Sequence, residues 1–248
     1  MAEPRHLNNA PIREAIIDFR VKLPSEFRVS EFLSLREQIG DRFPKFKERR
    51  SFKGEFKIAP GKPISTKAEE HGIHGYFFIT DDEKKIAQFR IDGFTFSRLK
   101  PYTYWEEIFD EAKELWALYV DAAKPQSVAR IAVRYINQLD IPLPITDFSI
   151  FLTAPPYIPD SLSCAISGFL TKITTYFPEL DIKANIIQAL EKSKEANYIS
   201  LILDIDVYKS QDFSPDSEDM WAFFEQFREL KNRIFFQSIT EETARLFE

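Results

Sequence analysis

The sequence predicts an α+β protein in which antiparallel strands form one or more sheets and long helices lie on one face. Three observations support this prediction. Short runs of alternating apolar and polar residues, each bounded by turn residues, recur along the chain and indicate strands. Two longer stretches place apolar residues at the helical period. After Pro125 the same order of elements begins again.

The first half opens with a strand and a helix. Residues 13–23 are rich in β-branched and aromatic residues, which indicates a strand. Ser30 can cap a helix whose apolar residues follow a helical period until Pro44 ends it. Residues 46–58 alternate apolar and charged side chains, so we expect a half-exposed strand there and a turn or loop at 59–63.

A strand meander and a long helix complete this half. The strands are HGYFFIT, IAQFRI and FTFSRL. The Asp92-Gly93 step predicts a tight hairpin between the last two, because glycine adopts the positive φ that a primed turn requires. Thr103 and Glu106 have the spacing of a capping box and precede one apolar stripe, so the sequence predicts a helix over 103–122.

The second half is predicted to repeat this order, with a short helix at 146–152. A final long helix follows Ser214-Pro215, because proline suits a first helical turn. Ser238 and Glu241 then have the spacing of a capping box for a last helical turn or two. The strands predicted in this half cover 127–141, 162–176, 181–191 and 198–208.

Residues 1–124 and 125–248 therefore share one order of elements, namely strand, helix, meander and long helix. Sequence identity between the halves is negligible, so a pseudo-duplication rests on this order alone. Two such units packed as one compact molecule would build a curved antiparallel sheet similar to the saddle of TATA-binding proteins. The comparison concerns the fold and implies no function.

Composition and cysteine content indicate the class of protein. The chain of 248 residues is 44% hydrophobic and 29% charged, which is typical of a globular protein. Its one cysteine, Cys164, cannot form an internal disulfide, which suits a reducing cytoplasm. The first residues lack the apolar run of a signal peptide, and no apolar stretch approaches the roughly 18–20 residues of a membrane span. We expect a cytoplasmic protein with no membrane partner.

Charge is unevenly distributed, although the net charge is only −6. Residues 42–67 hold nine Lys or Arg and two Glu, whereas residues 204–219 hold six acidic residues and one Lys. These segments could face each other, within one chain or between chains, or bind a charged partner. The basic segment also interleaves Phe with Lys and Arg, as surfaces for single-stranded nucleic acid do. A strand with one buried face is the more ordinary explanation, because the whole chain is acidic.

Motifs for cofactors are absent, so we expect no cofactor. The sequence contains neither a dinucleotide fingerprint nor a Walker A loop. Residues 72–75 (GIHG) match the loop of KH domains, but they precede a strand and are interpreted as a turn. Cys164 has no placed base near it in the sequence, so we expect a small core residue and no nucleophile.

Two groups of residues could hold a metal ion. His71 and His74 lie near Glu69 and Glu70, but the neighbouring glycines disfavour the helix that would bring the imidazoles together, so solvated loop histidines are expected. Asp204 and Asp206 alternate with apolar residues, so both carboxylates point to one face of a strand.

Arg130 and Arg134 share one face of another predicted strand. An ion-pair layer between these strands and the aspartates is favoured over a metal site, because paired charges satisfy each other without a cofactor. Asp204 and Asp206 are therefore only weak candidates for metal ligands.

Three segments resemble a sporadically distributed prokaryotic family of uncharacterised proteins. They are LNNAPIREAIIDFRV near the start, DGFTFSRLKPYTYWEEIFDEAKELWALY with the following RIAVRYINQLDIP, and FFQSITEETARLFE at the end. The resemblance spans nearly the whole chain and brings no activity, cofactor or catalytic residue with it. Such a distribution is typical of accessory genes, including those in defence or toxin–antitoxin loci, and so favours an interaction protein.

The expected function is that of a non-enzymatic binding or regulatory protein that engages a protein partner or itself, because no catalytic constellation is visible. Nucleic-acid binding through 42–67 and a divalent-metal-dependent enzyme using the two aspartates are the alternatives. The residues expected to form interaction surfaces are Arg98, Tyr102, Tyr104, Arg130 and Arg134, with Lys45, Arg49, Arg50 and Lys53 as a second patch.

Overall fold

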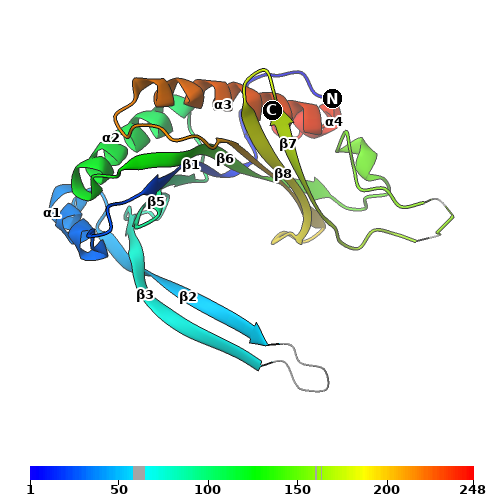
Figure 1. Cartoon of the computed structure of the whole chain (residues 1–248). Helices are drawn as coiled ribbons and strands as arrows, with labels where there is room; N and C mark the ends of the chain where they lie inside the picture. Colours follow the sequence, from blue (N-terminus) through cyan, green and yellow to red (C-terminus); the bar gives the residue numbers. More distant parts are fainter. Residues whose placement is uncertain (58–64, 160, 163) are drawn as a thin grey trace.

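The computed structural model describes residues 1–57, 65–159, 161–162 and 164–248, with side chains described outside 52–71. It shows an α+β fold built on one antiparallel sheet of nine strands (Figure 1). The strand order is β2-β3-β4-β5-β1-β6-β9-β8-β7. The strands are β1 (Ile12–Lys22), β2 (Lys45–Lys57), β3 (Ser65–Ile79), β4 (Lys85–Arg90), β5 (Gly93–Leu99), β6 (Ser127–Pro142), β7 (Leu170–Phe177), β8 (Ile182–Lys192) and β9 (Tyr198–Lys209).

Two long helices accompany the sheet. Figure 1 shows α2 and α3 along the same side of the sheet, and Phe19 of β1 contacts both of them: its ring stacks on Trp116 at 4.1 Å and lies 5.3 Å from Phe224. The helices are η1 (Val29–Ser34), α1 (Leu35–Ile39), α2 (Trp105–Ala123), η2 (Phe148–Ile150), α3 (Glu218–Ser238) and α4 (Glu241–Arg245).

The two halves of the chain meet at the centre of this one sheet. Residues 1–124 supply β1 to β5 and residues 125–248 supply β6 to β9, and β1 pairs antiparallel with β6. In each half the first strand lies beside the last strand of the meander, β1 beside β5 and β6 beside β9. Among the described residues, five strands of the sheet separate β2, in the basic segment, from β9, which begins the acidic segment.

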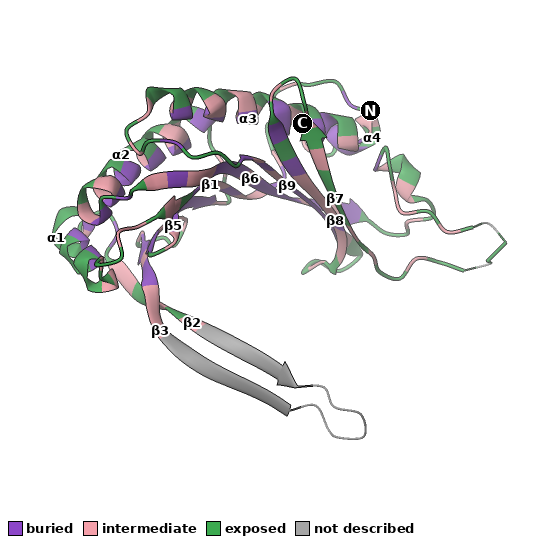
Figure 2. Cartoon of the chain, viewed as in Figure 1, coloured by how far each residue is buried: buried purple, intermediate pink, exposed green. Residues whose placement is uncertain are grey.

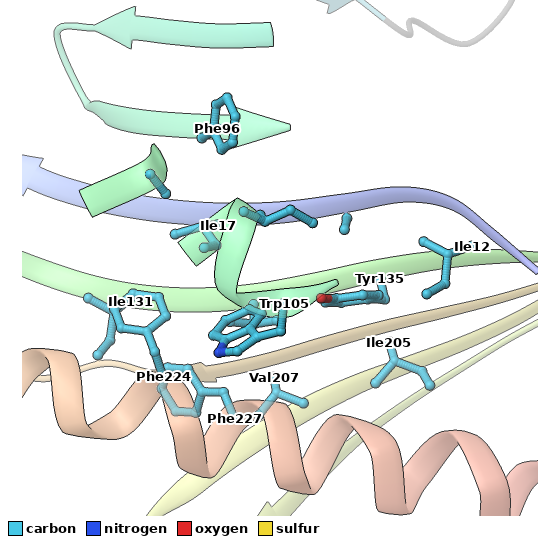
Figure 3. Close-up of a cluster of buried hydrophobic side chains, with 14 of the residues drawn as sticks. Ile12, Ile17, Phe96, Trp105, Ile131, Tyr135, Ile205, Val207, Phe224 and Phe227 are labelled. Atoms are coloured by element: carbon cyan, nitrogen blue, oxygen red, sulfur yellow. The ribbon is translucent and has the colours of Figure 1, made fainter. Parts of the chain in front are cut away.

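The core lies between the sheet and the two long helices. Alternate residues of the central strands are buried, for example Ile17 and Phe19 of β1 and Ile131, Val133 and Tyr135 of β6 (Figure 2). Figure 3 shows Trp105, Tyr135, Phe224 and Phe227 between these strands and α3. The alternating apolar and polar residues that predicted these strands therefore point, in turn, into this core and towards the opposite face of the sheet.

The hairpin predicted at Asp92-Gly93 is confirmed, since β4 and β5 pair on either side of it. Gly93 has φ +152°, and a Cβ atom there would lie 1.9 Å from the carbonyl oxygen of Phe19. Only glycine fits at this position, because the backbone of the neighbouring strand β1 lies so close to the turn.

Other local predictions are wrong. β7 begins at Leu170 and not near 162, and residues 72–75 lie inside β3, where Gly72 has φ +86° at an irregular point of the pairing with β2. Cys164 is exposed and lies outside the strands, so it is not a core residue. Among the described residues, pairing with β8 extends only from Leu170 to Phe177, so the strand is shorter than predicted.

Both predicted capping boxes are displaced. Tyr104 is the N-cap of α2, and the Thr103 hydroxyl instead donates to Glu107 at 2.5 Å. Thr240 caps α4, while Ser238 ends α3 and donates to the carbonyl of Ile234. Spacing alone identifies a helix start to within one or two residues. Among the helices of the described residues, none combines the length and apolarity needed to cross a membrane.

Candidate interaction face

The face of the sheet opposite the core carries charged side chains. In β6, Arg130 and Arg134 alternate with the buried Ile131 and Val133, so the arginines point away from the core. The same alternation places charged residues of β1, β4 and β9 on this face. We call the resulting set the Arg–Asp ladder: Asp18, Arg20, Arg90, Asp92, Arg130, Arg134, Asp204 and Asp206.

Two ion pairs join β6 to β9, and that of Arg134 with Asp204 is bidentate. Arg130 Nη2 lies 2.9 and 2.8 Å from the carboxylate oxygens of Asp206, and Arg134 reaches Asp204 through Nε at 2.8 Å and Nη2 at 2.5 Å. The guanidinium of Arg130 also lies over the ring of Tyr208, 4.4 Å from its centroid. The ion pairs that the sequence predicted between these strands are therefore present. The geometry of the Arg134–Asp204 pair matches the planar fork of arginine.

Asp18 of β1 connects these pairs to the first half of the chain. Its Oδ2 lies 3.3 Å from Arg130 and 3.2 Å from Arg20, and its Oδ1 lies 3.2 Å from Arg90. Thr95 donates to the same carboxylate at 2.6 Å. One carboxylate thus holds three arginines from three strands, and the ladder runs without a break from β4 to β9.

The arginines of the ladder lower the pKa of Asp92, a carboxylate beside the hairpin turn. Arg90 donates to it at 2.9 Å, Arg20 at 2.6 Å, and His74 Nε2 lies 3.1 Å away. Burial alone would raise the pKa of Asp92, but the hydrogen bond and charge of Arg90, with the charge of Arg20, lower it to about 2. The carboxylate is therefore ionised throughout the neutral range.

The ladder offers both charge signs to a partner. Arg20 and Arg134 have side chains 46% and 43% exposed, whereas Asp204 beneath Arg134 is only 8% exposed. The ladder contains four arginines and four aspartates, so its formal charges balance. Such a surface can exchange hydrogen bonds with a mixed polar surface and fix its orientation.

The other residues expected in the first interaction surface are not part of the ladder. Arg98 is 9% exposed, and its Nε is buried with no hydrogen-bond partner among the described residues, so little of this side chain is accessible to a partner. Tyr102 is half-buried, and its hydroxyl lies 3.1 Å from that of Tyr135. Tyr104 is 60% exposed at the start of α2. Both tyrosines lie at the helix side of the sheet, with α2 and α3.

Several cations in the described part of the basic segment have polar partners. Lys45 Nζ lies 3.0 Å from Glu83, Arg50 lies 2.7 Å from Glu48, and Arg49 donates to Gln88 at 2.9 Å. Burial, followed by the charge of Arg90, lowers the pKa of Arg49. The Lys53 side chain lies outside the described residues.

The aromatic rings of the described part of this segment are used in packing. Phe43 is 1% exposed, and Phe46 lies 5.0 Å from the ring of Tyr76. Phe43 is therefore inaccessible to a base, and one face of the half-buried Phe46 is used in packing against Tyr76.

The candidate metal ligands have other contacts. Asp204 and Asp206 accept hydrogen bonds from arginines, and Asn185 donates to Asp206 at 3.0 Å. His74 lies in β3 beside Asp92, so it is not a loop histidine as predicted. The side chains of Glu69, Glu70 and His71 lie outside the described residues. Among the described side chains, no group of three His, Cys, Asp or Glu converges on one point.

Sequence analysis missed half of the ladder. Asp18 and Arg20 lie in a correctly predicted strand, and their alternation with Ile17 and Phe19 already placed them on the exposed face. What the sequence did not show is that β1 and β6 are neighbours, which makes Asp18 the shared partner. Comparison of the chain with protein-family models and with curated proteins finds no match. The resemblance of the three segments to a prokaryotic family stays an expectation.

Proposed function

We propose that the protein is a non-enzymatic binding or regulatory module that engages a protein partner through the Arg–Asp ladder. In this proposal α2 and α3 cover one face of a curved, pseudo-duplicated sheet, and the ladder lies on the open concave side of a saddle. Apart from β2, which has no counterpart, the blocks β3-β4-β5-β1 and β6-β9-β8-β7 mirror each other about the β1–β6 pair, which supports the duplication.

The observation that carries the proposal is the ladder of arginines joined by aspartates, in which Arg20 and Arg134 are exposed, Arg130 is half-exposed and Arg90 is buried. Ion pairs between exposed side chains contribute little stability, so stability alone does not explain the exposed members of the ladder, Arg20, Asp92 and Arg134. A polyanion such as nucleic acid would be repelled by the four carboxylates. A protein surface with both charge signs can pair with arginines and aspartates together, and we take such a surface as the partner.

The test uses a variant that removes charge but keeps hydrogen bonding. Arg134→Gln with Asp204→Asn replaces the bidentate ion pair by two amides of similar shape. Its matched control is Arg42→Gln with Glu111→Gln, which neutralises an ion pair of 2.9 Å at α2. Each tagged protein is incubated with lysate of the cells that encode it, at low and moderate salt, and retained proteins are identified by mass spectrometry.

The proposal predicts a protein that wild type and the α2 control retain and that the ladder variant loses. Equal retention by all three would contradict the proposal. So would a retained species that nuclease removes, because that result identifies a nucleic acid as the partner. Thermal unfolding of each variant shows whether the fold is intact.

A second candidate function, self-association, is favoured by the edge strand β7. One side of β7 pairs with β8 and the other is the edge of the sheet. Leu170, Ile173 and Tyr176 of this strand are 75%, 57% and 54% exposed. Exposed apolar residues on an open strand edge favour pairing with another strand.

Light scattering at low and high salt tests the β7 edge. If β7 mediates self-association, the oligomer persists at high salt and is lost on Ile173→Lys, while Lys172→Gln on the same strand leaves it intact. A wild-type monomer at high protein concentration would rule this function out.

A further inference from the structure

A cavity of about 350 Å³ lies on the helix side of the sheet, away from the ladder. It is enclosed by the N-terminal segment, the start of α2, β6 and α3. Its lining combines aromatic and apolar surface with a small set of polar groups, as ligand sites do. The polar residues that matter for the argument are Tyr102, Asn137, Arg228 and Lys231.

Lys231 is the unusual residue of this cavity. It is 7% exposed, and among the described residues no carboxylate lies within ion-pair distance of its Nζ. The amine donates to Asn232 Oδ1 at 2.5 Å and lies 3.8 Å from the centroid of the Tyr135 ring. A buried ammonium without a counter-ion is expensive, so a neutral amine or a bound anion is favoured there.

Burial, followed by the charge of Arg228, lowers the pKa of Lys231 to about 7. The face of the Tyr135 ring opposes this by stabilising the ammonium. The other charged groups around the cavity are Arg5, His6 and Glu106. A substantial fraction of the amine is therefore unprotonated near neutral pH, and an unprotonated amine is a nucleophile.

Two phenols accompany the amine. The hydroxyls of Tyr102 and Tyr135 lie 3.1 Å apart, and Figure 3 shows Tyr135 between the strands and α3. Burial raises the pKa of both phenols, so both keep their protons at neutral pH and can donate hydrogen bonds. Tyr135 lies directly against Lys231.

Arg228 supplies a second cation at the mouth of the cavity. Its side chain is 34% exposed, and it pairs with Glu106 at 3.3 Å and Glu225 at 3.0 Å, both through Nη1. The remaining donors of its guanidinium can bind an acid group. The cavity is thus lined by a nucleophilic amine, the phenol of Tyr102 and an arginine, while Tyr135 packs against Lys231 without lining the cavity.

We propose that this cavity binds a small oxo acid, with Arg228 holding the acid group and Lys231 forming a reversible imine with the carbonyl carbon. This site is independent of the ladder and goes beyond the proposed binding function. The amine nitrogen adds to the carbonyl carbon, and the carbonyl oxygen takes a proton to give a carbinolamine. That hydroxyl then leaves with a further proton as water, and the C=N bond forms. Both protons come from the amine, and no oxidant or reductant is needed.

The test traps the imine on the full-length protein. Purified protein is incubated with pyruvate and then with sodium borohydride, which reduces an imine to a stable amine, and peptide mapping by mass spectrometry locates the adduct. We expect one adduct, on Lys231, whose yield rises as the pH of the incubation passes through about 7. Propanone, which has the carbonyl but no acid group, serves as the probe without an anion.

Variants separate the roles of the two cations. Lys231→Met removes the adduct, whereas Lys113→Arg, which changes an exposed lysine on α2, leaves it unchanged. Arg228→Gln should reduce labelling by pyruvate about tenfold, because a charge-assisted hydrogen bond is lost, and should leave labelling by propanone unchanged.

Peptide mapping of the wild-type protein does not depend on the folding of any variant, so its result alone tests the proposal. Adducts spread over exposed lysines with none on Lys231 would overturn it. Equal labelling of Lys231 by pyruvate and propanone would overturn the role of an acid group in the ligand.

Discussion

Asp92→Asn tests the electrostatics of the ladder in quantitative terms. A fall in the pKa of Asp92 from 3.8 to about 2 corresponds to about 2.4 kcal/mol of stability in the ionised state. Because the Asp92 side chain is 42% exposed, solvent screening reduces the expected value to about 1 kcal/mol. The substitution keeps the turn, since Asn-Gly suits a tight hairpin as well as Asp-Gly does.

The sign of the pH dependence follows from the lowered pKa. The folded state holds the Asp92 proton less tightly than the unfolded state, so the contribution is complete above about pH 4 and is lost as pH falls from about 4 to 2. The free energy of unfolding of the wild type should therefore exceed that of Asp92→Asn by about 1 kcal/mol at pH 7. This difference should shrink towards pH 2.

Urea denaturation followed by circular dichroism measures this difference at pH 7, 4 and 2.5. Asp41→Asn, at an exposed carboxylate after α1, is the control and should show a smaller change. The ion-pair reasoning would be refuted if wild type and Asp92→Asn had equal free energies of unfolding at pH 7, or if the difference between them did not change with pH.

Three further predictions concern the free energy of unfolding and are measured by the same denaturation assay. Gly93→Ala should destabilise the fold by about 3 kcal/mol or more, because its Cβ would clash with the Phe19 carbonyl. An unchanged free energy of unfolding would contradict the close approach of β1 to this turn. Phe224→Ala should cost about 3–5 kcal/mol, since this ring is fully buried against Phe19 and Trp221, and a cost below 1 kcal/mol would show that α3 packs differently. Arg134→Gln alone should lower the free energy of unfolding by about 1–2 kcal/mol, because it leaves the carboxylate of Asp204 unpaired. Adding Asp204→Asn should recover part of this loss. If the losses caused by the two single substitutions simply add in the double variant, the two side chains do not interact.

The fold class was largely predictable because it depends on local patterns. Seven of the nine observed strands overlap their predicted ranges closely, and both long helices begin within a few residues of the predicted starts. β3 begins at Ser65, well before the predicted start at His74. β7 was predicted too long, because exposed apolar residues near Leu162 resemble a strand when no pairing information is available. Helix caps failed for a related reason, since several Ser and Thr residues near one helix start have suitable spacing.

The candidate sites were less predictable because they depend on which strands are neighbours. Arg130, Arg134, Asp204 and Asp206 were paired correctly from alternation alone, but Asp18 gained its role only through the β1–β6 pairing. Lys231 lay in a correctly predicted helix, where a lysine is ordinary. Its burial became visible only once α3 was placed against Tyr135.

Arginine footprinting of the complex tests the role of the ladder most directly. Phenylglyoxal modifies accessible guanidinium groups, and Arg20, Arg134 and Arg42 have nearly equal side-chain exposures of 46%, 43% and 42%. Arg20 and Arg134 lie on the ladder, whereas Arg42 lies against α2 on the helix side. The proposal predicts that the captured partner protects Arg20 and Arg134 and leaves Arg42 reactive. Protection of Arg42 with unchanged reaction at Arg20 and Arg134 would place the partner on the helix side and contradict it.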